Sequence, residues 1–146
     1  MTLWQVATAF ADAIRTGRVV EQADLYYAPH AILAEGHWSE GGAPLAGIDE
    51  IRKALAARDA LYTKRRMTVD GPWFTGPITK RSGRFALRFR FELVARDGRM
   101  TQEVDSIGTS EVEDGLIVRQ DFWLPRDLRP VEPSTGWAAT RRMAMT

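Results

Sequence analysis

Residues 85–93 read FALRFRFEL, a run in which apolar and charged side chains alternate. A repeat of two residues is typical of a β-strand that has one face toward a core and the other toward water. The apolar face would carry Phe85, Leu87, Phe89, Phe91 and Leu93. The opposite face would carry Arg88, Arg90 and Glu92. This stretch predicts a long, half-buried strand.

Turn signals place further strands on both sides of it. Asp97–Gly98 and Asp114–Gly115 are dipeptides that favour tight hairpin turns. The first turn leads to a strand predicted over residues 100–112, and the second to a last strand over residues 116–124. An earlier strand is predicted over residues 67–74. Four long strands connected in this order form an antiparallel meander.

The N-terminal residues follow a helical period instead. Thr2 and Gln5 have the spacing of a capping box, in which each side chain satisfies a backbone amide at the start of a helix. Apolar residues then recur every three or four positions as far as Ile14. This pattern predicts a helix over residues 3–16 that stops at Gly17.

Two more helices and a short strand are predicted before the meander. Residues 19–27 continue a helical pattern that Pro29 ends, and residues 31–35 form a strand candidate. After a glycine-rich loop, a third helix starts at Gly47, with two carboxylates in its first turn. Helices followed by a run of strands indicate an α+β fold.

Composition limits the classes of protein. The chain has 146 residues, 45% of them hydrophobic and 27% charged, as expected for one globular domain. It has no cysteine, which excludes disulfides, thiolate nucleophiles and cysteine metal sites. The 20 basic and 19 acidic residues leave a net charge of +1, so no strong field would hold a nucleic acid.

The same properties favour a cytoplasmic protein. No stretch approaches the roughly 20 apolar residues of a membrane span, and residues 1–18 lack the features of a signal peptide. We expect a domain over residues 1–124, followed by an extended tail over residues 125–146 that carries Pro130 and Pro133.

Four segments carry a resemblance to a known superfamily. They are LYYAPHAILAEG (25–36), LAGIDEIRKAL (45–55), TVDGP (68–72) and VEDGLIVRQDFW (112–123). In this order the chain resembles the NTF2-like superfamily, in particular its SnoaL-like and ketosteroid-isomerase-like members. The resemblance implies a cone of three helices packed on a curved antiparallel sheet of four to six strands, which encloses an apolar pocket. This fold hosts isomerases, cyclases, hydrolases, dehydratases and binding modules, so it does not decide the function.

The resemblance also implies a candidate base. In ketosteroid isomerases a carboxylate after the strand that follows the second helix removes a proton, and Glu35 matches that position. His37 is the candidate proton donor, and Trp38 a candidate aromatic lid. The oxyanion-hole positions of the isomerases align with Phe10 and Gly108, which cannot donate a side-chain hydrogen bond.

The resemblance, together with the alternation along the strands, also implies which residues line the pocket. The predicted pocket is lined by Phe10, Ile14, Trp38, Leu87, Phe89, Phe91, Val104, Ser106, Ser110, Gln120 and Phe122. His37, Ser106, Ser110 or Gln120 would then have to stabilise an enolate. No cofactor is expected, and no metal, because the only two histidines show no recurring ligand spacing.

Two functions stay open at this point. One is a cofactor-independent isomerase or cyclase that removes a proton from a hydrophobic carbonyl compound through Glu35. The other is a non-catalytic module that binds a small molecule or dimerises, with Glu35 merely paired to an arginine. A homodimer through the outer, convex face of the sheet is expected in either case. The basic run at residues 64–66 is interpreted as a solvated surface.

Overall fold

The computed structural model describes residues 1–35 and 43–123. The predicted tail, together with His37 and Trp38, lies outside these residues. Three helices come from the first half of the chain: α1 (Leu3–Thr16), α2 (Ala23–Tyr26) and α3 (Ile48–Leu61). The strands are β1 (Tyr27–Ala34), β2 (Leu45–Ala46), β3 (Tyr62–Thr75), β4 (Gly83–Ala95), β5 (Thr101–Glu113) and β6 (Leu116–Trp123). The α+β class is confirmed.

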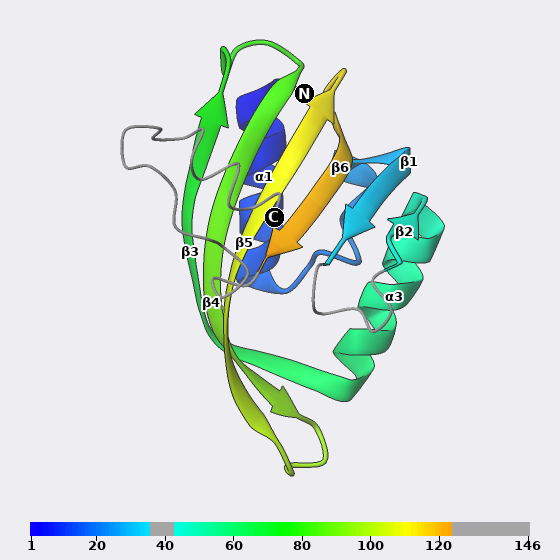
Figure 1. Ribbon diagram of the computed structural model, residues 1–146, viewed down its shortest axis with the longest axis vertical. Coiled ribbons are helices and arrows are strands. Elements are labelled where there is room, and N and C mark those ends of the chain that lie inside the picture. Colours follow the sequence, from blue (N-terminus) through cyan, green and yellow to red (C-terminus); the bar gives the residue numbers. More distant parts are fainter. Residues whose placement is uncertain (36–42, 124–146) are drawn as a thin grey trace.

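The six strands form one curved sheet in the order β2-β1-β6-β5-β4-β3 (Figure 1). The meander from β3 to β6 is antiparallel, as predicted. The pairing of β1 with β6 is parallel, which corrects the expectation of a purely antiparallel sheet. These two strands are joined through α3 and the whole meander, so no hairpin turn fixes their relative direction.

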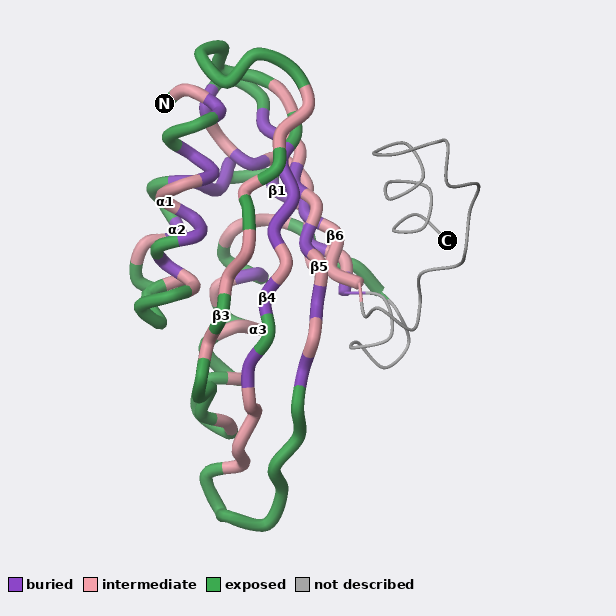
Figure 2. Tube along the Cα trace, turned by 90° about the vertical axis from the view of Figure 1, so that its left-hand side faces the viewer, coloured by how far each residue is buried: buried purple, intermediate pink, exposed green. Residues whose placement is uncertain are grey.

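The helices lie on one face of the sheet (Figure 2). Helix α1 begins at the predicted capping box, where the Thr2 hydroxyl accepts from the Gln5 amide and the Gln5 side chain accepts from the Thr2 amide. It ends at Gly17, whose φ of 69° is the left-handed conformation that glycine adopts most easily. Its apolar stripe packs against β3 and β4, and α3 packs against β1. The pocket described below lies between these layers.

The second helix is much shorter than predicted. Only Ala23–Tyr26 is helical, and the chain is already extended from Tyr27 onward. Pairing with β6 takes over there, since Tyr27 is aligned with Ile117. Pro29 is accommodated within β1 because the pairing is irregular between Tyr27 and Ile32, so no ladder hydrogen bond is required of it.

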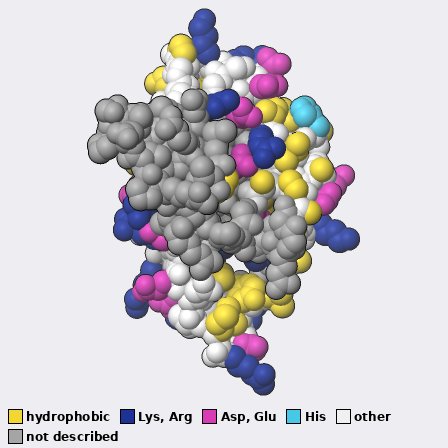
Figure 3. All heavy atoms as spheres, viewed as in Figure 1, with side chains coloured by type: hydrophobic (Ala, Val, Ile, Leu, Met, Phe, Trp, Pro, Cys, Tyr) yellow, Lys and Arg dark blue, Asp and Glu magenta, His cyan; other side chains and the backbone are white. Residues whose placement is uncertain are grey.

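The outer face of the sheet carries the predicted mixture of charges. Arg88 binds both carboxylate oxygens of Asp105, at 3.0 and 2.6 Å. Arg119 binds both oxygens of Asp121, at 3.0 Å each. Positive and negative side chains are interspersed on the side of the molecule away from α1 (Figure 3). These pairs compensate one another within the chain, and the homodimer through this face stays a prediction.

Candidate functional site

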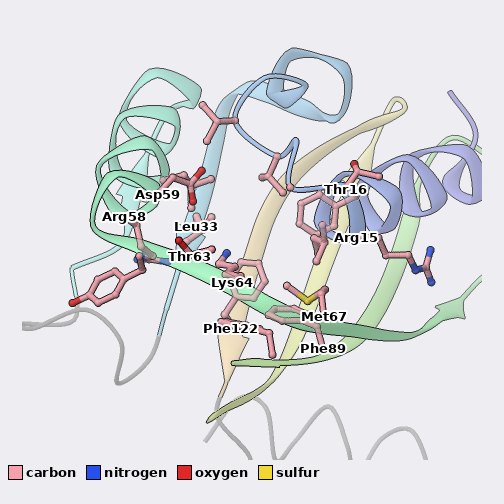
Figure 4. Close-up of a pocket in the computed structure, with 18 of the residues that line it drawn as sticks. Arg15, Thr16, Leu33, Arg58, Asp59, Thr63, Lys64, Met67, Phe89 and Phe122 are labelled. Carbon is pink, nitrogen blue, oxygen red and sulfur yellow. The ribbon is translucent and has the colours of Figure 1, made fainter. Parts of the chain in front are cut away.

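A pocket of about 420 Å³ opens between the helices and the concave face of the sheet. That volume lies within the range of small-molecule sites. Apolar side chains reach it from α1, β4 and β6, and polar ones from the end of β1, from α3 and from the start of β3 (Figure 4). Two chemically different walls therefore face the same space.

Aromatic rings make up the apolar wall. The rings of Phe89 and Phe91 on β4 are stacked with centroids 6.3 Å apart, and Phe122 on β6 meets Phe89 edge-on at 5.7 Å. Phe10 and Ile14 of α1 line the same pocket. The structure thus brings together five of the residues predicted to line it. The rings give this wall an apolar, aromatic surface.

Gly108 explains how Phe122 reaches this position. A Cβ atom at residue 108 would lie 2.7 Å from Cε1 of Phe122 and 3.5 Å from Cε1 of Phe89. The Phe122 ring therefore packs into the space that the missing side chain of Gly108 leaves on β5. An acidic side chain at residue 108, which the isomerase pattern would require, has no room beside this ring.

Glu35 lies directly after β1 and reaches the polar wall, with only 6% of its surface exposed. Nη2 of Arg58, on α3, donates to its Oε1 at 2.8 Å. Its second oxygen, Oε2, makes no hydrogen bond with any residue in 1–35 or 43–123. One oxygen is thus anchored while the other remains able to accept a proton.

Lys64, which belongs to the basic run interpreted as a solvated surface, also lines the pocket. Its Nζ lies 5.3 Å from the centroid of the Phe91 ring. Burial lowers the pKa of the ammonium group below the usual 10.5, and the nearby Arg58 adds to the effect, while Asp59 and Glu35 oppose it. Lys64 as a whole residue is exposed, so its side chain is in contact with both the pocket wall and solvent.

A shift in strand register places Lys64 on the face opposite to the one that a two-residue alternation predicts. Val69 is aligned with Phe89 and faces the pocket side, so strict alternation would turn residue 64 outward. A bulge between Arg65 and Thr68 changes the phase, and Lys64 is aligned with Leu93, on the inner face of β4. If the strand is taken to begin at Tyr62, directly after α3, alternation places Tyr62 and Lys64 on the same face. That pattern could have revealed Lys64 as a pocket residue.

Five predicted lining residues lie elsewhere, which corrects their assignment. They are buried in the core behind the pocket rather than in its wall: Leu87, Val104, Ser106, Ser110 and Gln120. The residues are buried as predicted for an inward face, but they pack against other core residues. An inward-facing side chain there meets packed protein instead of a cavity.

Their polar groups are already engaged. The Tyr27 hydroxyl donates a short hydrogen bond to Oε1 of Gln120, whose amide nitrogen donates to the Ser110 hydroxyl at 3.0 Å. The Ser106 hydroxyl donates to the carbonyl of Trp123. Burial raises the pKa of Tyr27 well above 10.0, with Tyr26 and Glu35 adding to the shift. None of the three predicted donors is therefore placed to bind an enolate in the pocket.

The described residues contain no group of three or more potential metal ligands. His37 and Trp38 lie outside the described residues, so their roles stay predictions. Among the helices that the structure describes, none combines the length and apolarity needed to cross a membrane.

Solved structures with the same architecture cover most of the chain. A protein from Mesorhizobium loti classed as a SnoaL-like polyketide cyclase is 24% identical, with a TM-score of 0.71 over 84% of this chain and 99% of that one. An NTF2-like protein of unknown function from Burkholderia pseudomallei is 15% identical, with a TM-score of 0.67 over the whole of both chains. A protein with a ketosteroid-isomerase-like fold from Catenulispora acidiphila, bound to trimethylamine, is 15% identical, with a TM-score of 0.58 over 86% of this chain and 97% of that one.

No model of a protein family matches the sequence, and no curated protein does. At these identities the likeness concerns the fold. The chain has the NTF2-like fold, the class to which SnoaL-like and ketosteroid-isomerase-like proteins belong. The activity has to be argued from the pocket itself.

Proposed function

We propose that this protein binds a hydrophobic carbonyl compound in the pocket and removes a proton from the carbon next to the carbonyl. Glu35 is the base, and in an isomerisation the proton is returned to a conjugated carbon. In a cyclisation the enolate carbon instead attacks a second carbonyl group of the same ligand, whose oxygen takes the proton. Neither reaction needs a cofactor. The observation that carries this proposal is the buried Glu35 carboxylate, which shares one pocket with the Phe89, Phe91 and Phe122 rings.

The geometry of Glu35 fits a base. Arg58 holds Oε1, which fixes the orientation of the carboxylate, and Oε2 is left without a hydrogen bond among the described residues. A general base has to lie within hydrogen-bond reach of the proton it removes, so a pre-oriented oxygen at the wall of a ligand pocket meets the first requirement. The aromatic wall excludes water from the other side of the ligand, which strengthens electrostatic interactions there.

Hydrogen exchange on a model ketone tests the proposal. 2-Tetralone in D₂O exchanges its acidic protons, and 1H NMR follows their loss. We expect the wild type to accelerate exchange and Glu35→Gln to abolish the acceleration, because an amide is not a base. Glu50→Gln is the matched control, since Glu50 is an exposed carboxylate on α3 that does not line the pocket. Acceleration that survives Glu35→Gln would show that another group is the base.

The Arg58–Glu35 ion pair favours a second function. A carboxylate held by a guanidinium is also what a purely structural wall residue would look like, in a module that binds a small molecule without converting it. Tight binding of 2-tetralone with no acceleration of exchange above the solvent rate would support this alternative.

We further propose a homodimer formed through the outer face of the sheet, where the Arg88–Asp105 and Arg119–Asp121 pairs lie. Because each of these charges already has a partner, an interface there would not leave an unmatched ion buried. Light scattering is expected to give twice the mass of the chain, and a monomer at micromolar concentration would contradict the proposal.

A further inference from the structure

The ammonium group of Lys64 is a cation without a matching anion in the described part of the chain. It forms no ion pair and no hydrogen bond with the described residues. Among them, it contacts the face of the Phe91 ring in a cation–π interaction. A ring face attracts a cation but does not neutralise its charge. Lys64 is an exposed residue that also lines the pocket, so a ligand that enters the pocket with an anionic group can give this amine a charged partner.

The other basic residues that line the pocket make hydrogen bonds within the described part of the chain. Arg58 binds Glu35, Arg15 binds Asp12 at 3.3 Å, and Nε of Arg96 donates to the carbonyl oxygen of Asp59 at 2.9 Å. Among the described residues, the pocket lining holds four basic residues, Arg15, Arg58, Lys64 and Arg96, against two acidic ones, Glu35 and Asp59, while Asp12 outside the lining pairs with Arg15. The described lining therefore favours a ligand that carries or develops negative charge.

We propose that Lys64 binds an oxyanion in this pocket, namely the enolate oxygen that forms when Glu35 removes a proton from the carbonyl compound. This inference rests on the proposed function, and it names the group that takes the place of the donors absent at Phe10 and Gly108. It also narrows the ligand to a class: a flat apolar body that fits the aromatic wall, with an oxygen that is or becomes negative.

The proposed step balances. The C–H bond next to the carbonyl breaks, and its proton goes to Oε2 of Glu35. The electron pair forms a carbon–carbon double bond, and the carbonyl oxygen takes the negative charge. Lys64 then donates a charge-assisted hydrogen bond to this oxygen, which is stronger than a bond to the neutral carbonyl. Return of the proton from Glu35 regenerates a carbonyl compound.

The electrostatic environment supports this role. Burial lowers the pKa of the Lys64 amine, so the pocket disfavours its charged form relative to water. An anion that enters the pocket beside the amine would favour the charged form. Lys64 lies on a strand rather than in a loop, so pairing with β4 defines the position of its backbone.

Two ligands of the same shape test the site directly. 2-Naphthoate carries an anionic carboxylate, and 2-naphthamide carries a neutral amide of nearly the same size. Calorimetric titration of the wild type is expected to give at least about tenfold tighter binding of the anion, the amount that one charge-assisted hydrogen bond supplies. Absence of such a preference would overturn the proposal.

Variants separate the role of Lys64 from a structural one. Lys64→Met is expected to bind both ligands equally, and Lys64→Arg to retain the preference, since it retains the charge. Lys53→Met is the matched control, because Lys53 is exposed on α3 and does not line the pocket. Circular dichroism establishes that each variant is folded. A preference for 2-naphthoate that persists in Lys64→Met would assign the anion site to another cation.

The exchange reaction distinguishes this inference from the proposed function. Lys64→Met is expected to slow exchange of 2-tetralone at saturation by about 10²–10³-fold, the loss typical of one oxyanion donor, with a smaller change in KM. Glu35→Gln is expected to abolish exchange but to keep or increase the preference for 2-naphthoate, because it removes a negative charge from the pocket. Exchange that survives Glu35→Gln while the preference still depends on Lys64 would refute the base alone. Exchange lost in Glu35→Gln but unchanged in Lys64→Met would refute the oxyanion site alone.

Discussion

Nη2 of Arg58 lies 2.8 Å from Oε1 of Glu35, and this ion pair joins the last turns of α3 to the end of β1. The side chain of Glu35 is 5% exposed and that of Arg58 is 27% exposed. The carboxylate is therefore buried, and the guanidinium side chain reaches solvent. The pair therefore closes one wall of the pocket and orients the proposed catalytic oxygen at the same time.

Replacing Arg58 with Met leaves the buried carboxylate without its charged partner. We expect the free energy of unfolding to fall by about 1–3 kcal/mol, less than for a fully enclosed pair because Arg58 is partly exposed. Urea denaturation measures the change. The double variant with Glu35→Gln should recover part of the loss, since no buried charge then remains. Arg52→Met is the control, because Arg52 pairs with the exposed Asp24 and should cost less than about 1 kcal/mol. Equal losses at Arg52 and Arg58 would contradict the special role of this pair.

Tyr27→Phe should destabilise the core beside the pocket. It removes the hydroxyl that donates to Gln120 and leaves Oε1 of that buried amide unsatisfied, at a cost of about 1–3 kcal/mol. Tyr62→Phe is the control, because the Tyr62 hydroxyl makes no hydrogen bond within the described residues and Tyr62 is only partly buried. Thermal unfolding at neutral pH measures both. A cost at Tyr27 no larger than that at Tyr62 would show that Gln120 finds another donor.

The same tyrosine predicts how stability changes with alkaline pH. The folded-state pKa of Tyr27 is raised well above 10.0, and that of Tyr26 is raised as well, both through burial. Above pH 10 the unfolded chain releases tyrosine protons that the folded chain retains, so the stabilisation is complete below that pH and is lost as the pH rises. We expect Tyr27→Phe to weaken this alkaline loss, as measured by urea midpoints on both sides of pH 10. Parallel pH profiles of wild type and variant would contradict the assignment.

Much of the fold could be predicted from the sequence, because each element has a local cause. The capping box at Thr2 and the glycine at residue 17 delimit α1, and the alternation in FALRFRFEL defines β4 and its inner face. The short α2 was harder to foresee, because the helical period before Tyr27 competes with strand pairing to β6, a contact about 90 residues away in the chain.

The candidate site was less accessible to sequence reasoning. Glu35 was placed through a resemblance, whereas its partner Arg58 lies on a helix whose angle to β1 no pattern encodes. Lys64 was missed because a bulge in β3 reverses the face of every residue before it. Ser106, Ser110 and Gln120 face inward as predicted, but facing inward does not reveal where the cone is filled and where it is hollow.

Gly108→Ala tests whether the position of Phe122 in the aromatic wall of the pocket depends on this glycine. The added methyl group would lie 2.7 Å from the Phe122 ring, so the ring has to move toward the pocket. We expect a loss of stability of about 1–3 kcal/mol and weaker binding of both 2-naphthoate and 2-naphthamide. The ratio of the two affinities should stay unchanged, because Lys64 is on another wall. Thr109→Ala, one residue further on the opposite face of β5, is the control. Unchanged affinities in Gly108→Ala would show that Phe122 does not form part of the wall that binds these ligands.

Lys64→Met should make the protein more stable, although it removes the proposed oxyanion donor. Because the folded-state pKa of Lys64 is lowered below 10.5, the unfolded chain binds this proton more tightly than the folded chain does. The charged lysine is therefore a cost to folding at neutral pH, and the cost decreases as the pH rises through the lowered pKa toward 10.5. Thermal unfolding of wild type and variant from neutral to alkaline pH should show the largest advantage of methionine at the neutral end. Lys53→Met, on the exposed side of α3, should show no such trend. A Lys64→Met variant that is less stable than the wild type at neutral pH would mean that the ammonium group stabilises the fold. The presence of a lysine at residue 64 would then be explained by stability, without a bound oxyanion.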